Sequence, residues 1–133
     1  MPEGSKPVLQ KLLLKPGMRA AVLNAPASYA QVLQQEALPS DVSLSRALDG
    51  APFDFIHAFA TRREDLLRDG PIWRQALKPS GVLWVSYPKG GSRAIPTDLN
   101  RDVVRETVQQ VGLDTVSQVA IDETWSALRL KPI

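Results

Sequence analysis

The stretch FDFIHAFATRREDLLRD, residues 53–69, holds a strand that runs directly into a helix. Three phenylalanines and one isoleucine fall within seven residues, which predicts a strongly apolar strand over 53–60. Thr61 and Glu64 have the spacing of a capping box, in which each side chain satisfies a free backbone donor at a helix start. The stretch therefore indicates an α/β domain.

Other apolar runs predict the remaining strands. Residues 18–24, MRAAVLN, are apolar without alternation, as in a strand that is buried on both faces of a parallel sheet. Residues 41–48 predict a weaker strand near an edge, and residues 82–87, VLWVSY, predict a central one. Residues 115–132 predict two strands around a tight turn at 122–124.

Helices are expected between these strands. In the first of them, over residues 6–14, Val8, Leu12 and Leu13 are expected to face inward. Gly70 and Pro71 are expected to divide the helical sequence that follows the 53–60 strand into two helices. The expected helices cover 6–14, run from Ser28 to the residue before Pro39, begin at Thr61 and again at Pro71, and cover 100–111.

Capping signals support two of these helix starts. Ser28 and Gln31 have the spacing of a second capping box. Asn100 is a suitable N-cap, and Leu99 and Val104 have the spacing of a hydrophobic staple.

Alternating strands and helices imply right-handed crossovers and a mostly parallel sheet with helices on both faces. Numbering the strands along the chain, we expect the order 2-1-3-4-6-5, with the last strand antiparallel. No repeat or linker is evident, so residues 1–133 are expected to form a single three-layer αβα, Rossmann-like domain.

This strand order, with its closing hairpin, resembles the class I S-adenosylmethionine-dependent methyltransferase fold. The segment ALKPSGVLWVS, residues 76–86, is similar to the LKPGGxLxVS segment before the fifth strand of those enzymes. FDFIHAF lies where their fourth strand would be. The resemblance implies a shortened methyltransferase-like sheet.

A second resemblance covers nearly the whole chain. It rests on KPGMRAAVLNAP, FDFIHAFATRREDL, LWVSYPKG, PTDLNRDVVRETVQQVGL and DETWSALRL. Together these segments resemble a bacterial family of domains of unknown function. This resemblance implies a fold and no activity.

Two features depart from the methyltransferase pattern. The loop NAPAS, residues 24–28, has no glycine where a glycine-rich turn would let the backbone approach a cofactor, and Pro26 removes one N–H donor. The second strand offers Ser45 and Arg46 where an acidic residue would bind the ribose, with Asp49 farther on. The segment before residue 53 is also short by one strand–helix unit. No cofactor is therefore expected, with S-adenosylmethionine kept as the alternative.

A ligand site, if there is one, is expected beyond the carboxyl ends of the strands, where the strand order reverses. Two segments are candidates for holding an anion. One is the start of the helix at Ser28, where the alternative is that the helix caps itself. The other is the loop YPKGGS, residues 87–92, where the alternative is an ordinary surface loop. The candidate lining residues are Asn24, Ala25, Pro26, Ser28, Thr61, Arg62, Tyr87, Lys89, Gly90 and Gly91.

Other polar and aromatic residues have structural explanations. His57 is expected to share one strand face with Phe53, Phe55 and Phe59, as a packed core histidine would. Trp84 is expected in the core and Trp125 under the hairpin, while Asp122 and Glu123 are expected to serve the turn. Arg62 and Arg63 open a helix, where positive charge is unfavourable to the helix dipole. Their position hints at an anionic ligand or partner, and the alternative is an ordinary solvated face. No catalytic residue is assigned.

Composition excludes several classes of function. The 133 residues include no cysteine and one histidine, which excludes a thiol nucleophile, a cysteine-ligated metal and a histidine-rich metal site, so no metal is expected. Sixteen basic and fourteen acidic residues are scattered along the chain, which disfavours nucleic-acid binding. No apolar run or signal pattern suggests a membrane, so a cytoplasmic location is expected.

Three functions remain open. The first is a non-catalytic binding or interaction domain, with a protein partner, that keeps the fold without the cofactor loop. The second is a small-molecule-binding enzyme or sensor with an anionic or nucleotide ligand in the crevice. The third is a divergent methyltransferase. A crevice filled by Pro26 and Tyr87 would exclude the second.

Overall fold

A computed structural model describes residues 8–27, 29–31, 39–48, 52–89, 95–122 and 124–133. Its centre is a six-stranded sheet in the order β2-β1-β3-β4-β6-β5, which confirms the predicted order. The first four strands are parallel, and β6 is antiparallel to both β4 and β5. The strands are β1 Arg19–Leu23, β2 Ser43–Ser45, β3 Phe53–Phe59, β4 Leu77–Pro88, β5 Leu113–Ala120 and β6 Trp125–Pro132.

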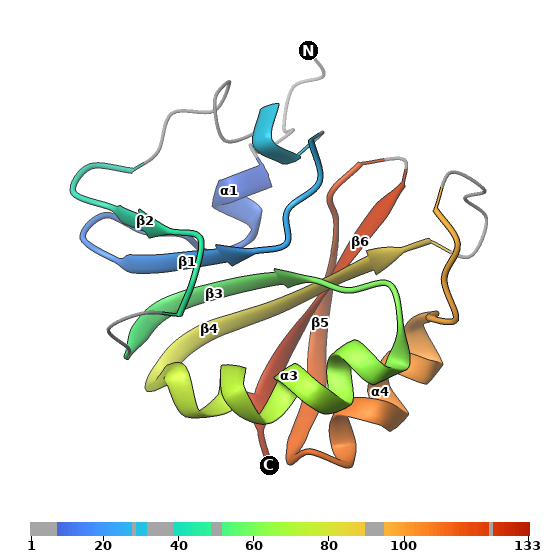
Figure 1. Ribbon diagram of the computed structural model, residues 1–133. Coiled ribbons are helices and arrows are strands. Elements are labelled where there is room, and N and C mark those ends of the chain that lie inside the picture. Colours follow the sequence, from blue (N-terminus) through green and yellow to red (C-terminus); the bar gives the residue numbers. More distant parts are fainter. Residues whose placement is uncertain (1–7, 28, 32–38, 49–51, 90–94, 123) are drawn as a thin grey trace.

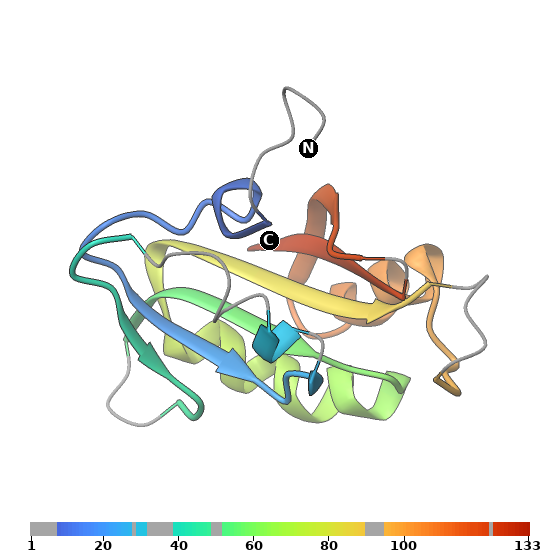
Figure 2. The same ribbon diagram turned by 90° about the horizontal axis from the view of Figure 1, so that it is seen from above.

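Helices cover both faces of the sheet, as expected of a three-layer αβα fold (Figure 1). Helices α3, Arg63–Ala76, and α4, Arg101–Gln109, lie against one face. The short helix α1, Val8–Lys11, lies on the other face, together with a helical turn at residues 27 and 29–31, here called the Tyr29 turn (Figure 2). No helix among the described residues is long and apolar enough to span a bilayer.

Each face of the sheet has its own apolar core. The core under α3 and α4 includes Ile56, Leu66, Trp73, Leu83 and Val104. The core under α1 and the Tyr29 turn includes Leu12, Tyr29, Phe55, Trp84 and Trp125.

Trp84 fixes α1 to the middle of the sheet. Its side chain is 1% exposed, which confirms the predicted core position. The indole Nε1 donates a hydrogen bond to the carbonyl of Leu12 over 2.8 Å. The segment that follows α1 is therefore held to β4 by a directional bond as well as by apolar contact.

The prediction of two helices separated at Gly70 and Pro71 is wrong, because α3 continues through both residues. Proline inside a helix removes one backbone bond and costs about 3 kcal/mol. The helix nevertheless continues because Leu66, Trp73 and Ala76 on either side of the proline are buried on the same core. Gly70 is required there, since a Cβ atom at this position would lie 2.8 Å from Val111 Cγ2.

Strand β4 begins at Leu77 rather than at residue 82, so the expected turn in KPSG is part of the strand. Phe53 pairs with Leu77 and Phe55 with Val82, so five positions of β4 oppose two of β3. This bulge changes which face each residue meets. Phe53 packs in the core under α3, and the expectation that it shares a face with His57 is wrong.

The inward face of the first helix also differs from the prediction. Leu9, Leu12 and Leu14 are buried, whereas Val8 and Leu13 are only partly buried. Two residues after the helix ends at Lys11, Leu13 has φ +68°, and the chain reverses its direction there. The reversal turns Leu14 inward in place of Leu13.

Helix α4 begins as its sequence predicts. The Asn100 side chain accepts a hydrogen bond from the amide of Val103 over 2.9 Å, which confirms the N-cap. Leu99 and Val104, the predicted staple, are both buried in the core under α3 and α4.

Replacing Asn100 by alanine is expected to destabilise the protein by about 1 kcal/mol, because the amide of Val103 loses its acceptor. Asn100→Asp keeps the acceptor and should retain stability. Urea unfolding followed by circular dichroism measures both variants. Equal loss in both would show that the cap does not stabilise α4.

Candidate functional site

The carboxyl ends of β1, β2 and β3 meet at the switch point of the sheet. The chain passes from β1 to β2 on one side and returns to β3 on the other side of β1. Open α/β sheets bind ligands at such a point, because the two connections diverge and leave a crevice. Three cavities lie at this end of the sheet, and Asn24 lines all of them.

Asn24 makes the turn for which the methyltransferase pattern uses a glycine. It follows β1 directly and has φ +59°, in the left-handed region. Asparagine adopts this region more readily than other residues with a Cβ atom. The chain therefore turns at Asn24 without a glycine, and the crevice begins at this residue.

The first cavity has a volume of about 250 Å³ and lies between β1, β2 and the Tyr29 turn. Two polar residues, Asn24 and Arg46, contribute to an otherwise apolar wall. No carboxylate lines this cavity among the residues that the structure describes. The full set of described wall residues is Val22, Asn24, Ala25, Ala30, Leu44 and Arg46.

The second cavity, of about 280 Å³, lies between β1, β3 and the hairpin. One side is aromatic, since the rings of Phe59 and Trp125 meet edge to face with centroids 5.1 Å apart. The polar side is formed by Asn24 with Thr61, Asp65 and Arg68. Trp125 is 5% exposed, which confirms that it packs under the hairpin.

The third cavity, of about 300 Å³, extends from Asn24 along α3. Arg46 lines it as well, so this residue lies between the first and third cavities. Asp69 and Trp73 of α3 form the opposite wall.

A larger cavity, of about 460 Å³, lies elsewhere, between the end of α3 and the start of β4. Its walls include Pro71, Leu77, Lys78 and Val111. It lies at the amino end of β4 and shares Ile72 with the third cavity, whereas strand topology directs ligands to the carboxyl ends of the parallel strands. The candidate site is therefore the crevice at Asn24.

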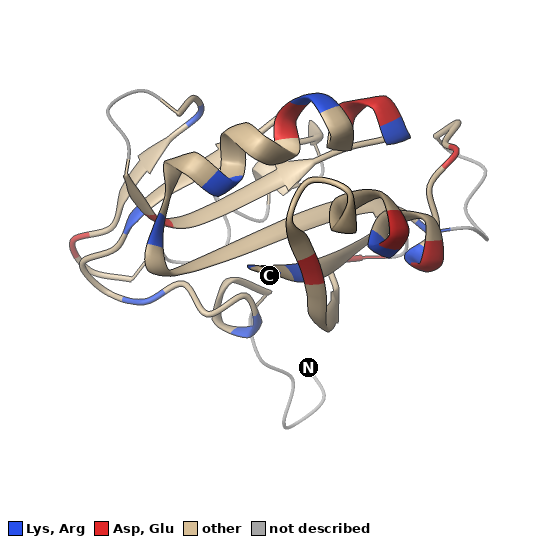
Figure 3. Cartoon of the chain, turned by 90° about the horizontal axis from the view of Figure 1, so that it is seen from below, with Lys and Arg blue, Asp and Glu red and all other residues tan. Residues whose placement is uncertain are grey.

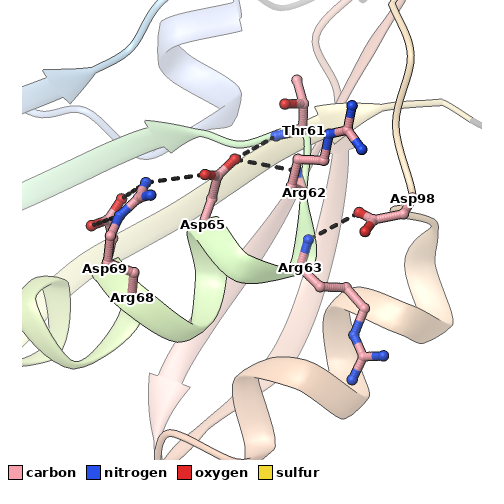
Figure 4. Close-up of polar contacts among 7 residues, drawn as sticks. All are labelled: Thr61, Arg62, Arg63, Asp65, Arg68, Asp69 and Asp98. Atoms are coloured by element: carbon pink, nitrogen blue, oxygen red, sulfur yellow. Dashed lines mark hydrogen bonds and ion pairs between the residues drawn. The ribbon is translucent and has the colours of Figure 1, made fainter.

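The N-terminus of α3 is capped by the protein's own carboxylates (Figure 4). Asp65 Oδ2 accepts from the amides of Thr61 and Arg62 over 3.3 and 3.2 Å, and Asp98 Oδ1 accepts from the amide of Arg63 over 2.9 Å. The predicted pairing of Thr61 with Glu64 is wrong, because the reaching carboxylate is one residue later. These amides are thus already satisfied and provide no site for an external anion.

The two arginines that open α3 have different surroundings. Arg63 Nε donates to Thr107 Oγ1 over 3.3 Å, which links α3 to α4. Arg62 is exposed. The position of Arg63 is therefore explained by its bond to α4, without an anionic partner.

His57 is fully buried in the middle of β3 and has a partner on each ring nitrogen. Nδ1 lies 3.0 Å from Tyr29 Oη, and Nε2 lies 2.6 Å from Ser86 Oγ. The ring also stacks on Phe59 with centroids 4.4 Å apart. Burial lowers the pKa of His57 to about 3, so the ring is neutral and serves the core, as predicted.

Four other predicted lining residues that the structure describes line none of the three cavities: Pro26, Arg62, Tyr87 and Lys89. Pro26 is partly buried, and its carbonyl accepts from the amides of Tyr29 and Ala30. Tyr87 is buried in the core under α3 and α4. Lys89 Nζ donates to the carbonyl of Asp122 over 2.6 Å. Ser28, Gly90 and Gly91 lie outside the described residues.

Asp122 serves the hairpin turn, as its sequence position predicts. Its Oδ1 accepts from the amides of Thr124 and Trp125, each over 2.8 Å. Glu123 lies outside the described residues. Within the described ranges, no group of three histidine, aspartate or glutamate side chains is placed to hold a metal ion.

Three cavity-lining residues were predicted for this region, Asn24, Ala25 and Thr61, whereas Arg46, Asp65 and Arg68 were not. Acidic and basic residues alternate in sign on α3 and α4 (Figure 3). Arg68 forms ion pairs with Asp65 at 3.0 Å and Asp69 at 3.1 Å. The i,i+3 spacing of Asp65 and Arg68 on one helix could have indicated the first pair.

Solved structures with this fold include several methyltransferases. An S-adenosylmethionine-dependent methyltransferase from Aquifex aeolicus has a TM-score of 0.63 at 14% identity, over 95% of this chain and 88% of that one. Ribosomal protein L11 methylase from Lactobacillus delbrueckii subsp. bulgaricus has a TM-score of 0.60 at 13% identity, over 93% of this chain and 74% of that one. The O-methyltransferase NcsB1, in complex with S-adenosylmethionine, has a TM-score of 0.66 at 11% identity, over 92% of this chain and half of that one.

These likenesses confirm the fold, a class I methyltransferase-like Rossmann sheet that is mostly parallel with an antiparallel C-terminal hairpin. No family model matches the chain, and no curated protein sequence matches it.

Removing the carboxylate that caps α3 is expected to cost about 1 kcal/mol in Asp65→Ala, because two amides lose their acceptor. Glu64→Ala is the matched control, since Glu64 is an exposed acid one residue earlier and should change stability little. Urea unfolding measures both variants. A larger loss in Glu64→Ala would contradict the observed cap and favour the predicted one.

His57 is expected to make stability depend on pH. Its folded pKa, about 3, lies below the unfolded value of about 6.5, so the unfolded chain binds the proton first as the pH falls. Stability should be complete above pH 6.5 and decline toward pH 4, by at most about 1.4 kcal/mol per pH unit. Urea unfolding across this range tests the decline, and His57→Gln should remove it.

Because His57 is the chain's one histidine, its ring protons in an NMR spectrum report it alone. A ring that titrates near pH 6.5 in the folded protein would contradict the buried, neutral state.

Proposed function

We propose that this chain binds a small, nucleoside-containing ligand in the crevice around Asn24. The observation that carries the proposal is the meeting of three cavities at one residue, at the switch point of a doubly wound sheet. Apolar walls with a few convergent polar groups are the usual composition of a small-molecule site. Here the polar groups are Asn24, Thr61 and Arg46.

The positions of two residues favour a ligand over a purely structural domain. Pro26 and Tyr87 were expected to fill the crevice if the fold had lost its ligand. Tyr87 is instead buried in the core under α3 and α4, and neither Tyr87 nor Pro26 lines any of the three cavities. The crevice therefore keeps space at the place where the fold provides it.

Methyl transfer is the second candidate function. It is supported by the likeness of the fold to S-adenosylmethionine-dependent methyltransferases, one of them in complex with that cofactor. The cavity beside β2 argues against the usual pose, because no described carboxylate lines it to bind ribose hydroxyls and Arg46 takes that position. Ligand binding without an assigned reaction is therefore the first proposal.

Thermal unfolding with 1 mM adenosine, adenosine monophosphate, S-adenosylmethionine or S-adenosylhomocysteine tests the proposal. A ligand that binds with a dissociation constant of about 10 μM adds about 2.7 kcal/mol and should raise the melting temperature by several degrees. Ala25→Trp should abolish the shift, because the new ring occupies the first cavity from an exposed position.

Ala120→Trp is the matched control. Ala120 is an exposed alanine on β5 that lines none of the cavities named here, so the shift should persist. No shift with any compound, or an equal shift in Ala25→Trp, would overturn the proposed site. A shift with the two S-adenosyl compounds alone would favour the methyltransferase candidate.

A further inference from the structure

Building on the proposed function, we infer that the crevice selects a phosphorylated nucleoside and that Arg46 binds its phosphate. The established likeness to methyltransferases does not suggest this ligand. The inference rests on the position of one guanidinium, on the charges around it and on the walls of the cavity beside it.

Arg46 is placed to meet a ligand from the end of β2. It follows Ser45, the last residue of that strand, and lines both the 250 Å³ and the 300 Å³ cavities. Its side chain is exposed and makes no hydrogen bond or ion pair with any residue in the described ranges. The five N–H donors of its guanidinium are therefore available to a ligand.

The two described aspartates of the crevice both bond Arg68 rather than Arg46. Asp69, on the far wall of the third cavity, bonds Arg68 through both carboxylate oxygens at 3.1 Å. Asp65 bonds Arg68 at 3.0 Å and accepts from two backbone amides. Neither aspartate lines the 250 Å³ cavity, so within the described residues the charge that Arg46 contributes to its wall meets no carboxylate, which favours an anion in that cavity.

The geometry of the first cavity fits a base next to a phosphate. Val22, Leu44 and Ala30 form an apolar wall suited to a flat ring, and Asn24 offers an amide to a base edge. A guanidinium binds phosphate oxygens with two parallel hydrogen bonds, an arrangement that an ammonium cannot make. S-adenosylmethionine carries a net positive charge, so Arg46 disfavours it.

Isothermal titration with adenosine and adenosine 5′-monophosphate tests the inference, with S-adenosylmethionine as a third probe. The monophosphate is expected to bind at least about tenfold more tightly than adenosine, since charge-assisted hydrogen bonds of this kind have that magnitude. Raising the salt concentration should weaken monophosphate binding and leave adenosine binding unchanged.

Arg46→Gln should lose about tenfold in affinity for the monophosphate and retain its affinity for adenosine. Arg46→Lys should be intermediate, because it keeps the charge and loses the planar fork. Arg101→Gln is the matched control, since Arg101 is an exposed arginine at the start of α4 and should bind like the wild type. Circular dichroism confirms that each variant is folded.

The inference is overturned if adenosine or S-adenosylmethionine binds as tightly as the monophosphate. It is also overturned if Arg46→Gln loses no affinity, or if it loses affinity equally for adenosine and the monophosphate. Those results leave the proposed site intact. If none of the three probes binds the wild-type protein, both the inference and the proposed function fail.

Discussion

The hydrogen-bonded histidine in the middle of the sheet holds the candidate site in place. His57 on β3 joins Ser86 on β4 to Tyr29, which follows β1. All three side chains are buried, so breaking either bond would leave a polar group unpaired, at a cost of about 1–3 kcal/mol. The Tyr29 turn is therefore held against the sheet, and the chain must bend sharply at Asn24 to reach it.

The sheet could be predicted from the sequence, because apolar runs and helix-start signals recur at regular intervals. Details that depend on distant contacts could not be predicted. Gly70 and Pro71 are local helix breakers, yet packing on both sides carries α3 through them. The bulge opposite Phe53 arises where KPSG joins the sheet, which no local pattern specifies. Tertiary packing outweighed local preference in both cases.

The location of the candidate site follows from strand order alone, and its residues follow only in part. Asn24 and Ala25 come directly after β1, so their place at the switch point was predictable. Tyr87 also lies near the end of a central strand, but the alternation of side chains along β4 buries it in the core under α3 and α4, away from the cavity walls. Arg46 could be placed at the end of β2 from the sequence, and its role as a wall of two cavities required the structure.

The most direct test of the central claim is a ¹⁵N-amide NMR titration of the full chain with adenosine 5′-monophosphate. The account predicts saturable shifts of the Asn24, Ala25 and Arg46 amides, with little change in α4 or β5. Shifts confined to the larger cavity near Leu77 and Lys78, or no saturable shift at all, would contradict the claim that the crevice at Asn24 is the binding site.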